Sequence, residues 1–164
     1  MEKTIAVLNE LEQAGILGRY AIGGAMAATF YAEPVVTFDL DIFVVLPQQQ
    51  GLLTLAPLYD ALRSRGCVEE GECITIEGIP VQFLPAYNAL LEEALAQATV
   101  MAYGSTTTRV LRAEHLVAIA LQTGRSKDRE RVRLLLEQAD LDRPLLDGIL
   151  IRHALHPRWR QWTQ

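Results

Sequence analysis

The chain has 164 residues, half of them hydrophobic, and a net charge of −5 at pH 7. This length is typical of one domain with its own buried core, and its short apolar runs fall well below the roughly 20 residues of a membrane-spanning helix. Charged residues near the start exclude the apolar stretch of a signal peptide, so we expect a cytoplasmic protein with no membrane partner.

The first third of the chain predicts alternating helices and strands. Apolar side chains at helical spacing predict an amphipathic helix over residues 3–15. A short strand, a turn at Gly23 and Gly24, and a helix of small residues reaching about Tyr31 follow. Phe38–Leu46 then has the composition of an apolar β-strand.

The middle of the chain continues this mixed pattern. Leucines at helical spacing predict a helix over residues 51–65. Two β-prone runs joined at Gly78 indicate a hairpin, a helix is expected over 87–97, and two short strands are expected around Gly104.

From Ala113 onward only helices are predicted, over residues 113–123, 126–139 and 143–155. The change at about residue 112 predicts an α+β fold. We expect a small mixed sheet packed by helices in residues 1–112, and a helical C-terminal segment in 113–164 that packs on this core.

Charge is unevenly distributed along the chain. Residues 1–104 contain 4 Lys and Arg against 13 Asp and Glu, whereas residues 105–164 contain 11 against 7. Either the charges form solvated helix faces and internal pairs, or the basic part receives a phosphate-bearing ligand or a nucleic acid.

Asp39 and Asp41 stand at the start of the predicted strand Phe38–Leu46. In an extended strand two such residues share one face, about 7 Å apart, where their like charges repel. A divalent cation between them would remove this cost, and Mg²⁺ prefers one or two protein carboxylates completed by water and phosphates. The alternative is an exposed acidic pair at a strand end.

The turn at Gly23 and Gly24 lies shortly before this acidic pair. Backbone N–H groups at a strand-to-helix turn suit a phosphate group. The alternative is a tight turn that only permits close packing.

The segment "IGGAMAATFYAEPVVTFDLDIFVVLP" resembles the signature of the polymerase-β-like nucleotidyltransferase superfamily, and "AEHLVAIALQTGRSKDRERVRLLL" is similar to its helical part. The closest resemblance is to small bacterial proteins of the minimal and abortive-infection toxin type. The resemblance implies a nucleotidyltransferase-type α+β fold and transfer of a nucleoside monophosphate from a nucleoside triphosphate (NTP) to an acceptor hydroxyl.

The resemblance also implies roles for individual residues. Asp39 and Asp41 would hold two Mg²⁺ ions, Gly23 and Gly24 would cradle the β- and γ-phosphates, and Thr37 would support the turn or touch a phosphate. The other implied nucleotide-binding residues are basic: Arg125 and Lys127. Arg125 has an alternative role, an ion pair with Asp128.

Two positions depart from the family pattern. Gln82 stands where the third catalytic carboxylate is expected, and an amide neither accepts a proton at neutral pH nor binds Mg²⁺ well. Glu72 or Glu77 would replace that charge if the hairpin brings either one to the metal. Ala120 stands where related proteins often have a lysine.

Three functions therefore stay open. The chain is an active nucleotidyltransferase, a degenerate homologue that still binds nucleotide, or an interaction protein with an antitoxin-like partner. The sequence leaves the acceptor open among RNA, protein and small molecules. Trp159 and Trp162 predict a terminal cap or a homodimer contact.

Overall fold

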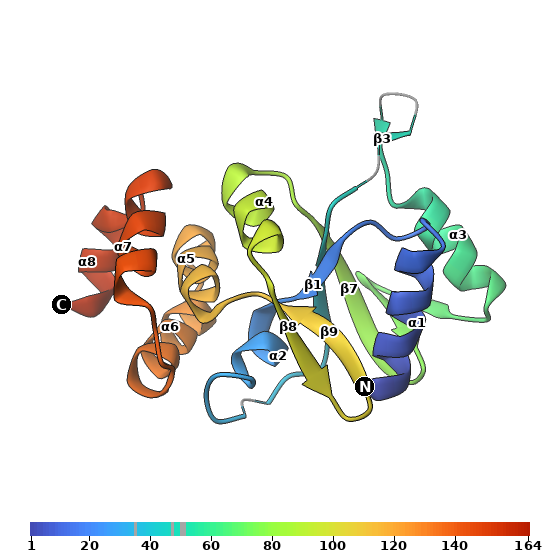
Figure 1. The fold of residues 1–164 in the computed structure, drawn as a ribbon, viewed down its shortest axis with the longest axis horizontal. Coiled ribbons are helices and arrows are strands. Elements are labelled where there is room, and N and C mark those ends of the chain that lie inside the picture. The colour runs from blue at the N-terminus through green and yellow to red at the C-terminus, as the bar shows by residue number, and fades with distance from the viewer. Residues whose placement is uncertain (35, 47, 50–51) are drawn as a thin grey trace.

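The computed structural model describes residues 1–34, 36–46, 48–49 and 52–164, and helices and strands are mixed as far as residue 112 (Figure 1). The helices are α1 (Glu2–Gln13), α2 (Gly24–Ala28), α3 (Ala56–Ser64), α4 (Ala89–Ala96), α5 (Ala113–Thr123), α6 (Ser126–Gln138), α7 (Arg143–Arg152) and α8 (His156–Thr163). The strands are β1 (Tyr20–Ile22), β2 (Leu40–Val44), β3 (Gln48–Gln49), β4 (Leu52–Leu53), β5 (Val68–Glu70), β6 (Cys73–Ile76), β7 (Ile79–Pro85), β8 (Thr99–Tyr103) and β9 (Thr106–Val110).

Seven strands form one mixed sheet in the order β5-β6-β7-β2-β1-β9-β8. The central strand β2 runs antiparallel to β1 and parallel to β7, and β1 runs parallel to β9. In the β2–β7 pairing Asp41 stands directly opposite Gln82. The predicted α+β class with a mixed sheet is therefore confirmed.

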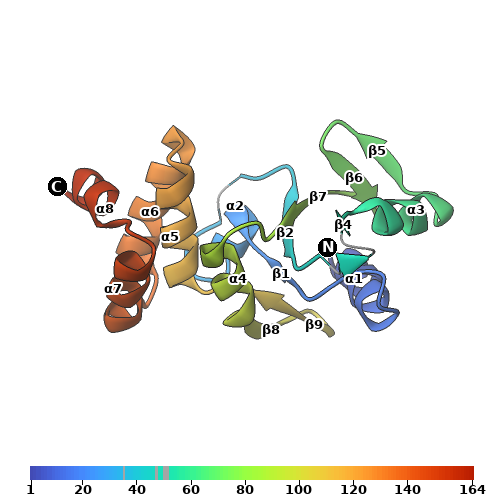
Figure 2. The same ribbon diagram turned by 90° about the horizontal axis from the view of Figure 1, so that it is seen from above.

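Helices α5 to α8 lie together at one end of the molecule, and α1 and α3 lie at the other end (Figures 1 and 2). Helix α5 packs on α6 and α7 and also contacts α2 and α4, so it connects the C-terminal helices to the helices of the α/β part. Gly124, with φ of +76°, ends α5 in the left-handed conformation that glycine adopts without strain.

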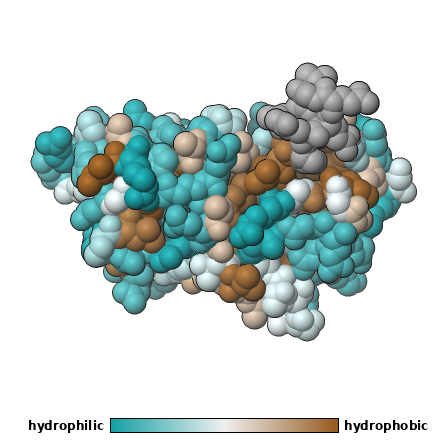
Figure 3. All heavy atoms as spheres, turned by 45° about the horizontal axis from the view of Figure 1, so that its top comes forward, coloured by the Kyte–Doolittle hydropathy of each residue, from teal (hydrophilic) through white to brown (hydrophobic). Residues whose placement is uncertain are grey.

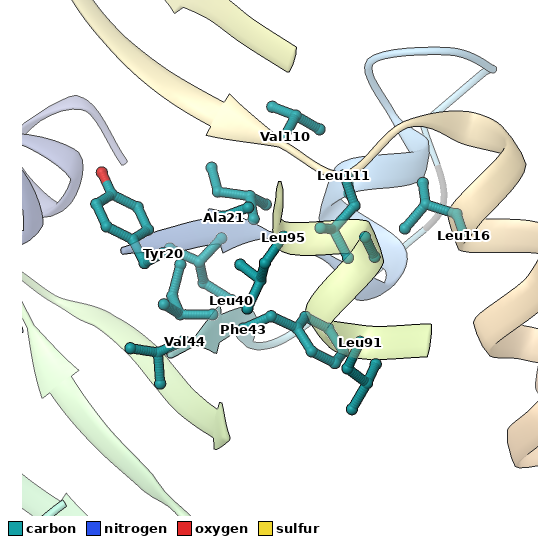
Figure 4. Close-up of a cluster of buried hydrophobic side chains, with 14 of the residues drawn as sticks. Tyr20, Ala21, Leu40, Phe43, Val44, Leu91, Leu95, Val110, Leu111 and Leu116 are labelled. Carbon is teal, nitrogen blue, oxygen red and sulfur yellow. The ribbon is translucent and has the colours of Figure 1, made fainter. Parts of the chain in front are cut away.

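The hydrophobic core lies where the central strands meet α4 and α5 (Figure 4). Tyr20, Leu40, Leu95 and Val110 are almost completely buried there. Burial of a large aliphatic side chain contributes roughly 1.5–3 kcal/mol. The residues after Asp41 on β2 belong to this core, so the strand that carries the carboxylate is held firmly.

Two predicted elements have different bounds in the structure. The strand predicted over Phe38–Leu46 begins only at Leu40, so Asp39 lies in a bend before it. The helix predicted over 51–65 begins at Ala56, because Pro57 suits the first helical turn and Leu52–Leu53 pair as a strand. Residue 51 lies outside the described residues.

Candidate active site

A cleft of about 800 Å³ opens between the central strands and the helices α5 and α6. This volume lies within the range of ligand-binding pockets. Most of the predicted site residues line the cleft: Gly24, Thr37, Asp39, Asp41, Gln82, Arg125 and Lys127. Gly23 is not among the lining residues.

The two aspartates reach the cleft from different local structures. Asp41 is the second residue of β2, and Asp39 stands in the bend before the strand, where the Thr37 hydroxyl donates a hydrogen bond to its carboxylate at 3.3 Å. The prediction that both aspartates belong to one extended strand is therefore wrong, because pairing with β7 starts only at Leu40. Both side chains nevertheless face the same cleft.

The surroundings of Asp41 disfavour the charged form of its carboxyl group. Burial raises the pKa of its carboxyl, and the neighbouring Asp39 charge raises this pKa further. Cations on or just before α6 act in the opposite direction: Arg131, Lys127 and Arg125. Among the described residues, none forms a hydrogen bond or ion pair with the Asp41 carboxylate.

The glycine turn packs directly against the strand of Asp41. A Cβ atom added to Gly24 would lie 1.8 Å from Asp41 Oδ2, and one added to Gly23 would lie 2.3 Å from the Phe43 ring. Gly23 also donates its backbone N–H to the Asp41 carbonyl at 2.9 Å. The sequence offered close packing as the alternative role of this turn but did not identify Asp41 as the partner of Gly24, because the two residues lie 17 positions apart.

Gln82 occupies the place next to Asp41 on the neighbouring parallel strand. Its side-chain amide donates a hydrogen bond of 2.9 Å to the Glu72 carboxylate, and Glu72 also lines the cleft. Glu77 lies in the β6–β7 turn, at the other end of β6, and does not line the cleft. The structure therefore separates the two glutamates that the sequence left as alternatives.

The opposite wall of the cleft is basic and is organised by Asp128. This carboxylate is buried and forms ion pairs with Arg125 at 2.8 Å and Arg131 at 3.2 Å. It also accepts the backbone N–H of Arg125, which caps the start of α6. The ion pair with Asp128, one of the two roles considered for Arg125, is present, and Arg125 also lines the cleft, where its nucleotide-binding role stays a prediction. Ala120 lines the cleft from α5.

Two exposed aromatic rings also line the cleft. Phe38 is 86% exposed and Tyr87 is 81% exposed, which is unusual for rings of this size in a monomer. The sequence predicted Phe38 as the first residue of a strand, and no sequence signal marked Tyr87.

The donor set fits Mg²⁺ bound together with a nucleotide. Within the described segments no Lys, Arg or His forms an ion pair with Asp39 or Asp41, and two such carboxylates suit an ion that takes its remaining ligands from water and phosphate oxygens. In the part of the chain that the structure describes, no group of three or more His, Cys, Asp and Glu side chains forms a metal site. Among the same residues, no helix is long and apolar enough to cross a membrane.

Comparison with protein-family models and with curated proteins finds no match for the chain. Solved structures are similar over nearly all of it. ANT(2″)-Ia, in complex with adenylyl-2″-tobramycin, has a TM-score of 0.56 at 16% identity, covering 97% of this chain and 99% of that one. An antigenic nucleotidyltransferase-like protein from Paracoccidioides brasiliensis has a TM-score of 0.53 at 13% identity, covering 82% and 74%. The chain therefore has a nucleotidyltransferase-like fold.

Proposed function

We propose that the chain is a Mg²⁺-dependent nucleotidyltransferase that moves a nucleoside monophosphate from an NTP to the hydroxyl group of an acceptor. The observation that carries this proposal is the meeting of Asp39 and Asp41 with a basic wall across one cleft. The fold, shared with ANT(2″)-Ia, supports it.

In this reaction the acceptor oxygen forms a bond to the α-phosphorus, the bond from this phosphorus to the bridging oxygen breaks, and pyrophosphate leaves. The acceptor proton passes to a base. Asp39 and Asp41 would hold the metal, which offsets the phosphate charge when bound. Arg125 and Lys127, exposed on the basic wall, would orient the β- and γ-phosphates.

The acceptor can be assigned only by class. The ligand of the ANT(2″)-Ia structure is adenylyl-2″-tobramycin, which supports a small hydroxylated molecule as one class to test. The resemblance to abortive-infection toxins adds RNA and a partner protein as further classes.

A nucleotide-binding protein without transfer activity is the second candidate. Gln82 and Ala120 favour it, because they replace a carboxylate and a lysine with uncharged side chains. The face shown in Figure 3 mixes hydrophobic and hydrophilic surface, so this face alone does not favour an interaction protein over the two nucleotide-binding candidates.

Labelled NTPs and calorimetry test this proposal. The protein is incubated with Mg²⁺, each of the four NTPs, and tRNA, total protein or an aminoglycoside, and label transfer and pyrophosphate release are measured. Binding of each Mg²⁺–NTP is measured for the wild type, Asp41→Asn and the control Asp140→Asn, which changes an exposed aspartate outside the cleft.

We expect loss of binding for Asp41→Asn alone. Binding without transfer to any acceptor would favour the second candidate. Equal binding by all three proteins would contradict both nucleotide readings.

A further inference from the structure

Helix α8 packs loosely on the outer side of the C-terminal helices (Figure 2). None of its eight residues, all within the part of the chain that the structure describes, is buried, and Trp159 and Trp162 are only partly buried against the core. A hollow of about 440 Å³ is lined by α6 and α8, and another of about 480 Å³ is lined by α8 and the end of α5. Burial of apolar surface therefore contributes little to the attachment of this helix.

One side chain of α8 reaches the end of α5. Arg158 Nη1 donates hydrogen bonds to the carbonyl oxygens of Leu121 at 2.7 Å and Gln122 at 3.2 Å. Both carbonyls belong to the last turn of α5, where a helix leaves its carbonyl groups without donors of its own, and the partial negative charge of a helix C-terminus favours a cation. Arg158 therefore stabilises the last turn of α5.

The turn between α5 and α6 is held on both sides. On the α5 side the Arg158 guanidinium lies against Gly124, and a Cβ atom added to this glycine would overlap with Arg158 Nη1. On the α6 side the backbone N–H of Arg125 donates to the Asp128 carboxylate at 3.2 Å. Arg158 and Asp128 together thus fix the backbone from which the Arg125 side chain extends.

This turn also forms part of the cleft. Gln122, Arg125 and Lys127 line the cleft, whereas Arg158 is not among the described residues that line it. Gln122 therefore faces the cleft with its side chain and accepts the Arg158 hydrogen bond with its carbonyl. A shift of the last turn of α5 would move Arg125 relative to the acidic wall.

We propose that Arg158 is a positioning residue of the nucleotide site. By fixing the end of α5, it holds the turn at Gly124 so that the Arg125 guanidinium orients the phosphates across the cleft from Asp41. Helix α8 thus contributes to nucleotide binding from outside the cleft. This inference rests on the proposed nucleotidyltransferase function.

Nucleotide binding provides a test that does not require turnover. Calorimetry measures the binding of Mg²⁺ with the α,β-methylene analogues of ATP, GTP, CTP and UTP, which cannot transfer the nucleotidyl group. We expect Arg158→Ala to weaken binding about 3- to 10-fold, because the last turn of α5 loses both hydrogen bonds. Arg158→Lys keeps a charged donor for these carbonyls and should restore most of the binding.

Arg160→Ala is the matched control. It removes the same charge from the same helix, at an exposed residue outside the cleft, and should leave binding unchanged. The comparison with Arg158→Ala therefore removes the general effect of one lost positive charge on an anionic ligand.

A double-mutant cycle separates positioning from a general loss of structure. Arg125→Ala alone should weaken binding about 10-fold or more, because a charge-assisted contact with phosphate is lost. Since Arg158 acts through Arg125, adding Arg158→Ala to Arg125→Ala should weaken binding by less than about 2-fold further. Equal effects of Arg158→Ala with and without Arg125 would overturn the positioning role.

The outcomes also separate this inference from the proposed function. Binding by Arg158→Ala that equals binding by Arg160→Ala, while Asp41→Asn loses binding, would overturn the role of Arg158 and leave the proposed function standing. Unchanged binding in Asp41→Asn would overturn both. Circular dichroism checks the fold of every variant, and Arg158→Met, which keeps an apolar stem but lacks the donors, gives the same comparison if Arg158→Ala does not fold.

Discussion

Gly24→Ala is expected to disturb the site through one steric contact. Gly24 has a φ of +59°, and an alanine Cβ there would lie 1.8 Å from Asp41 Oδ2. The left-handed backbone costs a residue with a Cβ about 1–2 kcal/mol. Forcing the Asp41 carboxylate aside adds about 1–3 kcal/mol, the usual cost of overpacking.

Gly15→Ala is the matched control. Gly15 has a φ of +71°, but nothing lies within 4 Å of its added Cβ. This control should therefore show the backbone cost alone, about 1–2 kcal/mol. The difference between the two variants isolates the contact with Asp41.

Urea unfolding followed by circular dichroism measures these free energies of unfolding. We expect Gly24→Ala to be less stable than Gly15→Ala by about 1–3 kcal/mol. In an Asp41→Ala background most of this difference should disappear, because the two shortest contacts of the added Cβ, with Asp41 Oδ2 at 1.8 Å and Cγ at 2.7 Å, are removed. Equal losses for the two glycine variants, or a difference that persists without the carboxylate, would refute the steric argument.

Three further predictions concern charge. Asp41→Asn should raise the melting temperature of the metal-free protein in a thermal scan, because burial and the Asp39 charge disfavour its carboxylate; a decrease would contradict this. Asp128→Ala should lower the free energy of unfolding by about 3–5 kcal/mol in urea titrations, because the buried acid holds two arginines, and a loss under 1 kcal/mol would contradict its role. Thermal stability should fall on acidification in two steps. The first step begins below pH 6.5, because burial lowers the pKa of His115, so that the folded protein resists protonation there. The second step runs from pH 4.5 towards 2, because hydrogen bonds to Glu93, led by that from Arg152, hold the pKa of Glu93 at about 2. A flat stability profile from pH 7 to 3 would contradict both steps.

Local patterns allowed much of the fold to be predicted from the sequence. Helix α5 has the predicted bounds, because a continuous apolar pattern ends at Gly124. The β6–β7 hairpin has its turn at the predicted Gly78, whose φ is +80°. Strand β5 was not predicted, because its three residues are exposed and show no apolar alternation. The division into two domains stays a prediction.

In the candidate site, too, local patterns could be predicted from the sequence and contacts between distant segments could not. The Asp39 and Asp41 pattern could be recognised within five residues of sequence. The bond between Gln82 and Glu72 depends on how two strands pair, and the close fit of Gly24 on Asp41 depends on how a turn meets a strand. Such contacts are decided by tertiary packing, which a single sequence does not reveal.

The uneven charge of the sequence places opposite charges on the two walls of the cleft. Its acidic wall comes mainly from the part of the chain with 13 acidic and 4 basic residues, and its basic wall from the part with 11 basic and 7 acidic ones. Without a ligand the opposite charges of the two walls attract each other, and salt weakens such an attraction between solvent-exposed charges. We therefore expect ionic strength to change the width of the unliganded cleft. If a metal–nucleotide complex binds as proposed, its cation would pair with the acidic wall and its phosphates with the basic wall, and both would replace the attraction between the walls.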